Sequence, residues 1–178
     1  MRKGKDTDFA KVSALVVGVA VLAVAVAGRF CLFDVRYAAG IGAGSSVAAR
    51  MCNPLFHAGV AHAVVNVYVL WQLVFFFPLR MRHLLLAYAV ACLCPWQCAV
   101  WPEYGAHALG LSGVVYGLMG WVMPETTHRS RFNVVVAVWM VLGMLTRQMA
   151  VGLHLWCYAV CAIMSFFFGR FALIHLRR

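Results

Sequence analysis

The chain has 178 residues, of which 65% are apolar and only 11% are charged. A soluble domain carries roughly 25% charged residues, so this chain has too few to cover a water-exposed surface. Fifteen basic residues against five acidic ones give a net charge of +10. The apolar runs between the basic clusters are too long for one small soluble core, which excludes a soluble nucleic-acid-binding protein. The composition predicts an integral membrane protein whose basic residues lie on the cytoplasmic side.

Six apolar segments have the length and composition expected of membrane helices. A spanning helix needs about 20 mostly apolar residues, and helices are expected because lipid offers backbone groups no hydrogen-bonding partner. In chain order the segments are 12–27, 55–77, 84–100, 109–123, 132–145 and 149–168. The sequence therefore predicts an all-α fold. It is a single membrane domain over residues 1–178, with six transmembrane helices and a cytoplasmic tail at 1–11.

The basic residues predict how this bundle is oriented. With the amino terminus in the cytoplasm, eleven of the fifteen basic residues fall on the inner side, which favours cytoplasmic positions for both termini. An alternative treats residues 2–27 as a cleaved secretory signal, because Ala25-Val-Ala27 resembles a cleavage site. The apolar run that begins at Val12 is longer than most signal cores, which favours a membrane helix.

The fourth segment is short for a membrane helix. At the helical rise its fifteen residues cover only about 22 Å, less than the hydrocarbon thickness of about 30 Å. We therefore expect the helix to begin below the outer surface, after an irregular loop. Such a loop is tolerated at membrane depth only where protein buries it or where it lines a wet cavity. The short segment is thus the first indication of a functional site.

Polar side chains gather in the outer halves of the second, fourth and sixth segments. His62 and Asn66 are four residues apart and share a helix face. Ser112 lies in the first turn of the fourth segment, and His154 lies roughly 8 Å below the outer end of the sixth. Polar groups inside a membrane are costly and are functional candidates by default. We expect these four side chains to meet at similar depth, within reach of external water.

Serine and histidine together indicate nucleophilic catalysis. A serine hydroxyl is a weak nucleophile until a neighbouring imidazole takes its proton. None of the five acidic residues is placed to orient His154 within the bilayer, so we expect a Ser112–His154 dyad in place of a triad. Tyr116, one turn after Ser112, is placed to stack on the imidazole. His62, Asn66 and the Ser112 backbone N–H are the predicted donors to an oxyanion.

Glycines recur along the fourth segment at positions 110, 113, 117 and 120. A face of small residues lets membrane helices approach closely, which would bring the sixth segment, and so His154, against Ser112. Each feature alone also has a structural interpretation. A lone intramembrane histidine often serves packing, and a lone serine in a membrane helix usually bonds to its own backbone. The combination carries the catalytic hypothesis.

Four of the seven cysteines fall near the predicted outer surface, where an oxidising compartment permits a disulfide: Cys31, Cys52, Cys94 and Cys98. The cysteine spacing does not match a zinc site, and the metalloprotease motif HExxH is absent. We therefore expect neither a metal nor a cofactor. His107, in the outer loop before Ser112, is a further residue that could shape the site.

These residues resemble the rhomboid family of intramembrane serine proteases. The run Gly110-Leu-Ser-Gly-Val-Val-Tyr-Gly-Leu-Met-Gly120 is similar to the family's nucleophile segment, and His57, His62 and Asn66 match its second-helix pattern. The resemblance covers residues 55–168. It implies that Ser112 is the nucleophile and His154 the base, with His62, Asn66 and the Ser112 N–H as the oxyanion hole. Supporting roles fall to Gly110, Gly113, Tyr116, Gly117 and His57.

The resemblance also implies the substrates, which are transmembrane helices of other membrane proteins, cut near their outer ends. The outer loop 28–54 lacks the Trp-Arg pair of many members, so its fold and the lateral gate are not implied by the resemblance. Leu153 precedes the histidine, and Cys157 and Cys161 stand where the family usually has glycines, which predicts a slightly wider approach of the fourth and sixth helices.

Other functions stay open at this point. Rhombosortases are similarly compact six-helix relatives that process carboxy-terminal sorting tails, and non-proteolytic rhomboid-like proteins bind transmembrane helices but lack the serine or the histidine. A small transporter would place its polar cluster near the bilayer centre, between inverted repeats, and no repeat is visible here. The expected partners are the lipid bilayer and membrane-protein substrates. The compact chain favours a bacterial plasma membrane, and the sequence does not indicate an oligomeric state.

Overall fold

The structure is a computed structural model that describes residues 2–30, 40–99, 108–145 and 150–175. Within these ranges the chain is helical, without a strand, and one isolated antiparallel bridge joins Ile41 to Ala108. The elements are α1 (Arg2–Phe30), α3 (Val47–Cys52), η1 (Asn53–Leu55), α4 (Val60–Phe76), α5 (Met81–Cys92), α6 (Trp96–Ala99), α7 (Ser112–Val122), η2 (Met123–Glu125), α8 (Arg129–Leu145) and α9 (Val151–His175).

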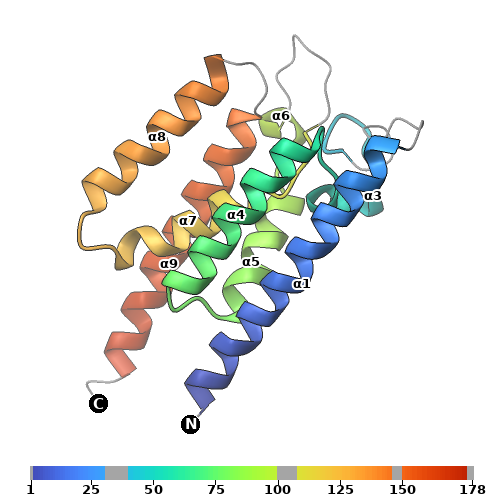
Figure 1. The fold of residues 1–178 in the computed structure, drawn as a ribbon. Helices are drawn as coiled ribbons and strands as arrows, with labels where there is room; N and C mark the ends of the chain where they lie inside the picture. Colours follow the sequence, from blue (N-terminus) through green and yellow to red (C-terminus); the bar gives the residue numbers. More distant parts are fainter. Residues whose placement is uncertain (1, 31–39, 100–107, 146–149, 176–178) are drawn as a thin grey trace.

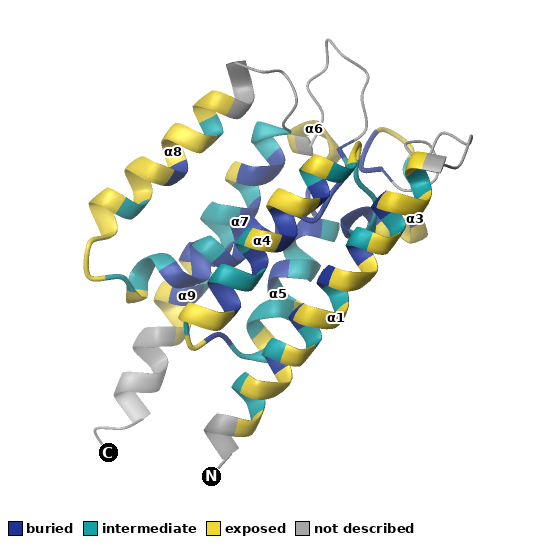
Figure 2. Ribbon diagram, viewed as in Figure 1, coloured by how far each residue is buried: buried dark blue, intermediate teal, exposed yellow. Residues whose placement is uncertain are grey.

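The longer helices form a bundle around α7 (Figure 1). Helix α7 packs mainly against α9 and α5, and α4 packs against α1. The beginning of α1 and the end of α9 lie at the same end of the bundle, as Figure 1 shows. The short helices α3 and α6 lie at the opposite end. Every residue of α7 except Met119 is buried, so this helix forms the centre of the core (Figure 2).

Two helices are long and apolar enough to cross a membrane, over Lys5–Arg29 and Val151–Phe168. A third span results if Val47–Leu55 and Val60–Phe76, which meet at an angle of 81°, are counted together. Helices α5 and α7 are shorter, with 12 and 11 residues. The described part of the chain is thus compatible with a membrane protein.

The helix boundaries differ from the predicted segments in several places. Helix α1 already begins at Arg2, so residues 2–11 of the predicted tail are part of this helix. The segment 55–77 is not one continuous helix, because Phe56 and Gly59 have extended backbone and α4 begins only at Val60. Helix α5 ends at Cys92, well before residue 100. Pro95 follows closely, and proline removes a backbone N–H and disfavours helical geometry in the residue before it. Helix α7 begins at Ser112 rather than at 109.

Gly110 explains where α7 begins. Its φ angle of 125° lies in a region that L-residues with a side chain rarely adopt. The chain can therefore turn sharply just before Ser112, which becomes the first residue of the helix. The predicted irregular loop before the fourth helix corresponds to this segment, of which the structure describes residues 108–111.

Helix α8 differs from the other long helices because it is largely exposed. Val136 is its buried residue within 129–142, where exposure is described, while Val134, Val138 and Trp139 are exposed. A side-chain hydrogen bond links it to α9, from the Tyr158 hydroxyl to Asn133 Oδ1. Figure 2 shows α8 as the most exposed of the long helices.

Candidate active site

Ser112 and His154 lie in direct contact at the centre of the bundle. Ser112 Oγ and His154 Nε2 are 2.8 Å apart, within hydrogen-bonding distance. Ser112 is the first residue of α7, and His154 lies in the first turns of α9. Their exposed fractions are 5% and 2%, so the pair is shielded from bulk solvent. Such a contact between a hydroxyl and an imidazole is the arrangement that activates a serine nucleophile.

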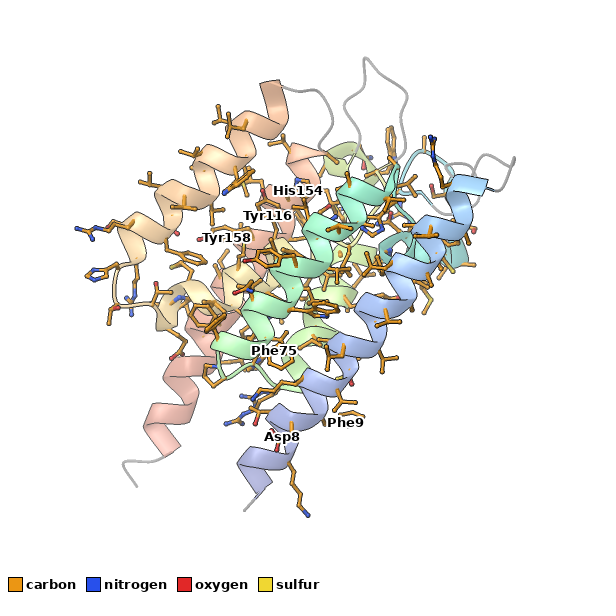
Figure 3. All side chains as sticks on the ribbon, viewed as in Figure 1. Asp8, Phe9, Phe75, Tyr116, His154 and Tyr158 are labelled. Carbon is orange, nitrogen blue, oxygen red and sulfur yellow. The ribbon has the colours of Figure 1, made fainter. Side chains whose placement is uncertain are left out.

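Tyr116 holds the imidazole from one side. The Tyr116 and His154 ring centroids are 4.5 Å apart and the ring planes differ by 22°, which is a stacked arrangement. Figure 3 shows both labelled side chains next to each other between α7 and α9. The second ring nitrogen of His154, Nδ1, is buried and has no hydrogen-bond partner among the described residues. Within the described ranges, packing against Tyr116 and not a carboxylate therefore holds this ring.

Small residues allow α7 to approach its neighbours closely. A Cβ atom at Gly113 would lie 3.2 Å from Ala91 Cβ and 3.5 Å from Cys157 Sγ, and one at Gly117 would lie 3.1 Å from Ala87 Cβ. These two glycines thus face both α5 and α9. The thiol of Cys161 would lie 3.2 Å from the Gly117 Cβ. The two cysteines therefore fill the space beside the glycines.

The tightest contact between α7 and α9 is at Gly120. A Cβ atom there would overlap the Tyr158 carbonyl oxygen and lie 2.9 Å from the Ala162 nitrogen. Both are backbone atoms, so no side-chain rearrangement could relieve the contact. The glycine face predicted for the fourth segment thus lies against α9, most closely near the carboxy-terminal end of α7.

His57, His62 and Gly110 form a second group beside the dyad. The His57 and His62 rings meet edge to face, with centroids 5.2 Å apart. A Cβ atom at Gly110 would lie 3.3 Å from both rings, so only a glycine fits between them without displacing them. His57 Nε2 accepts a hydrogen bond of 3.1 Å from the Leu111 N–H. His57 thereby holds the backbone directly before Ser112.

Asn66 lies one turn after His62 on α4 and is buried, with 7% of its surface exposed. Its Nδ2 group, a hydrogen-bond donor, has no partner among the residues that the structure describes. A buried donor without a partner is costly, which is the property expected of a group that binds a ligand or a transition state. No described hydrogen bond links Asn66 or His62 with Ser112.

Sequence reasoning missed Asn53. This residue is 1% exposed, and its Oδ1 accepts a hydrogen bond of 3.2 Å from the Gly110 N–H. Asn53 falls in the stretch 28–54 that the sequence predicts as a loop, where polar residues are common and no helical period marks one of them as buried; the structure places it at the start of η1. Its spacing of four residues before His57 was the only available signal.

A cavity adjoins these residues on the described surface, and another lies away from them. A cavity of ≈ 390 Å³ lies between the end of α1 and the start of α4, and its lining includes Arg29, Phe56, His57 and Gly59. A larger cavity of ≈ 760 Å³ is formed by the turn 124–131 and contains none of the predicted site residues. The smaller one adjoins the site through His57.

Several sequence-based expectations concern residues outside the described ranges. His107 and Cys31 belong to this group, as does the end of the predicted segment 84–100. Cys52, Cys94 and Cys98 carry free thiols. Within the described residues, no three histidine, cysteine or acidic side chains are grouped so that they could hold a metal ion.

Taken together, the arrangement places a serine hydroxyl, an imidazole, a buried amide donor without a partner among the described residues, and a helix amino terminus in one region. That set of groups is suited to acyl transfer. No known protein-family model matches the chain, and no curated protein sequence matches it.

Proposed function

We propose that the chain is an intramembrane serine endopeptidase of the rhomboid type. It hydrolyses a peptide bond in the transmembrane segment of another membrane protein, near the outer end of that segment. The observation that carries the proposal is the 2.8 Å contact between Ser112 Oγ and His154 Nε2, both buried within a largely apolar bundle. The cost of placing two such polar groups there favours a catalytic role.

The chemistry follows from the dyad. With its own proton on Nδ1, His154 accepts the Ser112 hydroxyl proton at Nε2 while Oγ attacks the carbonyl carbon of the substrate. The tetrahedral intermediate then collapses, the C–N bond breaks, and Nε2 returns the proton to the departing amine. Water attacks the resulting acyl-enzyme while His154 takes one water proton at Nε2. The second tetrahedral intermediate then collapses, the C–Oγ bond breaks, the carboxylic acid leaves, and Nε2 returns the proton to Ser112 Oγ.

The oxyanion of the intermediate requires donors close to Ser112. The Ser112 backbone N–H belongs to the first turn of α7, where helix N–H groups have no intrahelical acceptor. The buried Asn66 Nδ2, which has no partner among the described residues, is a second donor. His62, next to Gly110, is the third. Donors held in place before the reaction stabilise the developing charge without reorganisation.

The proposed topology has six membrane spans with both termini in the cytoplasm. Six helices of eleven or more residues support it: α1, α4, α5, α7, α8 and α9. A 12-residue helix covers only about 18 Å, so α5 and α7 span the bilayer together with the loops and short helices at their outer ends. Buried irregular backbone is tolerated there. By this topology the protein is a multi-pass membrane protein, and its compact chain favours a bacterial inner membrane.

The substrate reaches the dyad from the membrane or from its outer surface. Helix α8 exposes Val134, Val138 and Trp139, so lipid and a substrate helix can both contact it. The cavity of ≈ 390 Å³ beside His57 supplies space for an extended peptide near the outer end of α4. A peptide must leave the helical conformation to reach Ser112, since its carbonyl groups are otherwise bonded within the helix.

Cleavage of a single-span model substrate in proteoliposomes tests the proposal. The wild-type protein should cut within or beside the outer end of the transmembrane segment, while Ser112→Ala and His154→Ala should each lose cleavage. Ser165→Ala is the matched control. Like Ser112→Ala it removes a buried serine hydroxyl, but this hydroxyl lies on α9 and donates to the Trp121 carbonyl. Cleavage that persists in Ser112→Ala, or is absent from the wild-type protein with several substrates, would contradict the proposal.

A further inference from the structure

We propose that Asn53 is a positioning residue for the nucleophile. Its side chain sets the backbone conformation of Gly110 and thereby the placement of Ser112. The inference rests on the function proposed above and extends it to a residue outside the dyad and the oxyanion donors.

The first observation is the contact itself. The Gly110 N–H donates to Asn53 Oδ1 at 3.2 Å and lies 3.3 Å from the Asn53 backbone oxygen. The side-chain oxygen and the backbone oxygen of Asn53 thus both accept a hydrogen bond from the Gly110 N–H. With 1% of its surface exposed, it is among the most buried polar residues of the described chain. No water can replace it in that contact without displacing protein atoms.

The second observation is what this hydrogen bond holds. Gly110 has a φ angle of 125°, and Ser112 begins α7 two residues later. The next N–H, of Leu111, donates to His57 Nε2 at 3.1 Å. Two successive N–H groups before the nucleophile are therefore fixed by side chains from the segment 53–57. That segment is itself held by an N–H of Phe56 that donates to the Asn53 carbonyl at 3.2 Å.

The third observation concerns the Ser112 N–H. Helix α7 has no side-chain N-cap, since its capping residue is Leu111. Asn53 and His57 bind the two preceding N–H groups, and no acceptor for the Ser112 N–H is found within the described ranges. The segment 53–57 thus supplies acceptors for the Gly110 and Leu111 N–H groups. The Ser112 N–H is left available to donate to the oxyanion.

Loss of the Asn53 side chain would leave a buried N–H without its side-chain acceptor and let Gly110 change conformation. The displacement would pass to Ser112 Oγ and its own N–H. Small misplacements of a reacting group lower the rate steeply. The effect should therefore appear in kcat rather than in KM, since Asn53 does not touch the peptide in the proposed mechanism.

The experiment measures the rate at which a fluorophosphonate labels Ser112 in the full chain, together with hydrogen exchange over 109–116 and thermal unfolding. Asn53→Ala should slow labelling at least about tenfold, lower kcat at similar KM, and speed exchange of the Gly110 and Leu111 amides. Asn53→Asp, which keeps an acceptor oxygen in the same place, should restore most of the rate. Ser165→Ala, which removes a buried hydrogen bond three turns along α9, should alter neither labelling nor that exchange.

The outcomes separate the two proposals. If the wild-type protein is labelled and Asn53→Ala reacts as fast, the positioning role is wrong while the proposed function stands. The positioning role is equally wrong if Ser165→Ala slows labelling as much as Asn53→Ala does and loses the same thermal stability. A wild-type protein that is not labelled at all overturns the proposed function and the positioning role with it.

Discussion

Tyr116 lies almost parallel to His154, with 4.5 Å between the ring centroids and 22° between the ring planes. The two residues come from different helices, so the stack also fixes α9 against α7 at the depth of Ser112. His154 Nδ1 has no polar partner among the described residues. In the proposed mechanism the phenol ring therefore does by packing what a carboxylate does by hydrogen bonding in a triad.

Replacing the Tyr116 ring should therefore impair the reaction more than removing its hydroxyl. Tyr116→Phe keeps the stacked ring and should retain a rate close to that of the wild-type protein. Tyr116→Ala should lower kcat by about 10- to 100-fold, because the imidazole is free to turn away from Ser112. Substrate cleavage at saturating concentration measures the effect. Equal rates for the two variants would show that the stack does not orient His154.

The oxyanion donors provide a second prediction. His62→Ala and Asn66→Ala should each lower kcat by roughly 10²–10³ with little change in KM, because each removes a donor that acts on the transition state. Gln72→Ala is the matched control, since it shortens a partly buried polar side chain further along α4. If Asn66→Ala matches Gln72→Ala in rate, Asn66 is not a donor to the oxyanion.

Gly120 should be the glycine of α7 that tolerates substitution least. In Gly120→Ala the new methyl group would overlap the Tyr158 carbonyl and approach the Ala162 nitrogen, so α7 and α9 must separate. Such overpacking typically costs about 1–3 kcal/mol. Gly28→Ala is the control, because a Cβ there meets nothing within 4 Å and alanine favours a helix over glycine. Thermal unfolding in detergent should show a lower midpoint for Gly120→Ala than for the wild-type protein, and no lowering of the midpoint for Gly28→Ala. Comparable midpoints would mean that the helices are not held at this distance.

Gly152 should connect α6 to the active site. Gly152 lies in the first turn of α9, two residues before His154. A Cβ atom at Gly152 would overlap the Cys98 carbonyl oxygen. Gly152→Ala should therefore displace the start of α9 and slow fluorophosphonate labelling of Ser112 at least about tenfold. Gly28→Ala again serves as the control. A Gly152→Ala protein that unfolds at a lower temperature but labels at the wild-type rate would assign Gly152 to stability alone.

The grouping of Ser112 and His154 could be anticipated from the sequence because few polar residues interrupt the apolar segments. Their depth along each helix follows from the helical rise alone. The structure places the two groups 2.8 Å apart, while their catalytic roles stay predictions. Tyr116 could be anticipated for the same reason, since it follows Ser112 by one helical turn.

The outer end of α4 could not be anticipated in this way. Residues 55–59 carry no charged residue and no proline, so the sequence does not mark the break before Val60. At the bend of 81°, Asn53 and His57 make hydrogen bonds with the loop before α7. Such contacts join residues 54 or more positions apart along the chain, and no local pattern encodes them.

The central claim is that the Ser112 hydroxyl is a nucleophile activated by His154. Its most direct test is mass-spectrometric mapping of a fluorophosphonate adduct on the full chain in detergent, alongside Ser112→Ala, His154→Ala and Ser165→Ala. The account predicts one adduct per wild-type molecule, located on Ser112, retained in Ser165→Ala and lost in the other two variants. An adduct found on another residue, or equal modification of all four proteins, would contradict it.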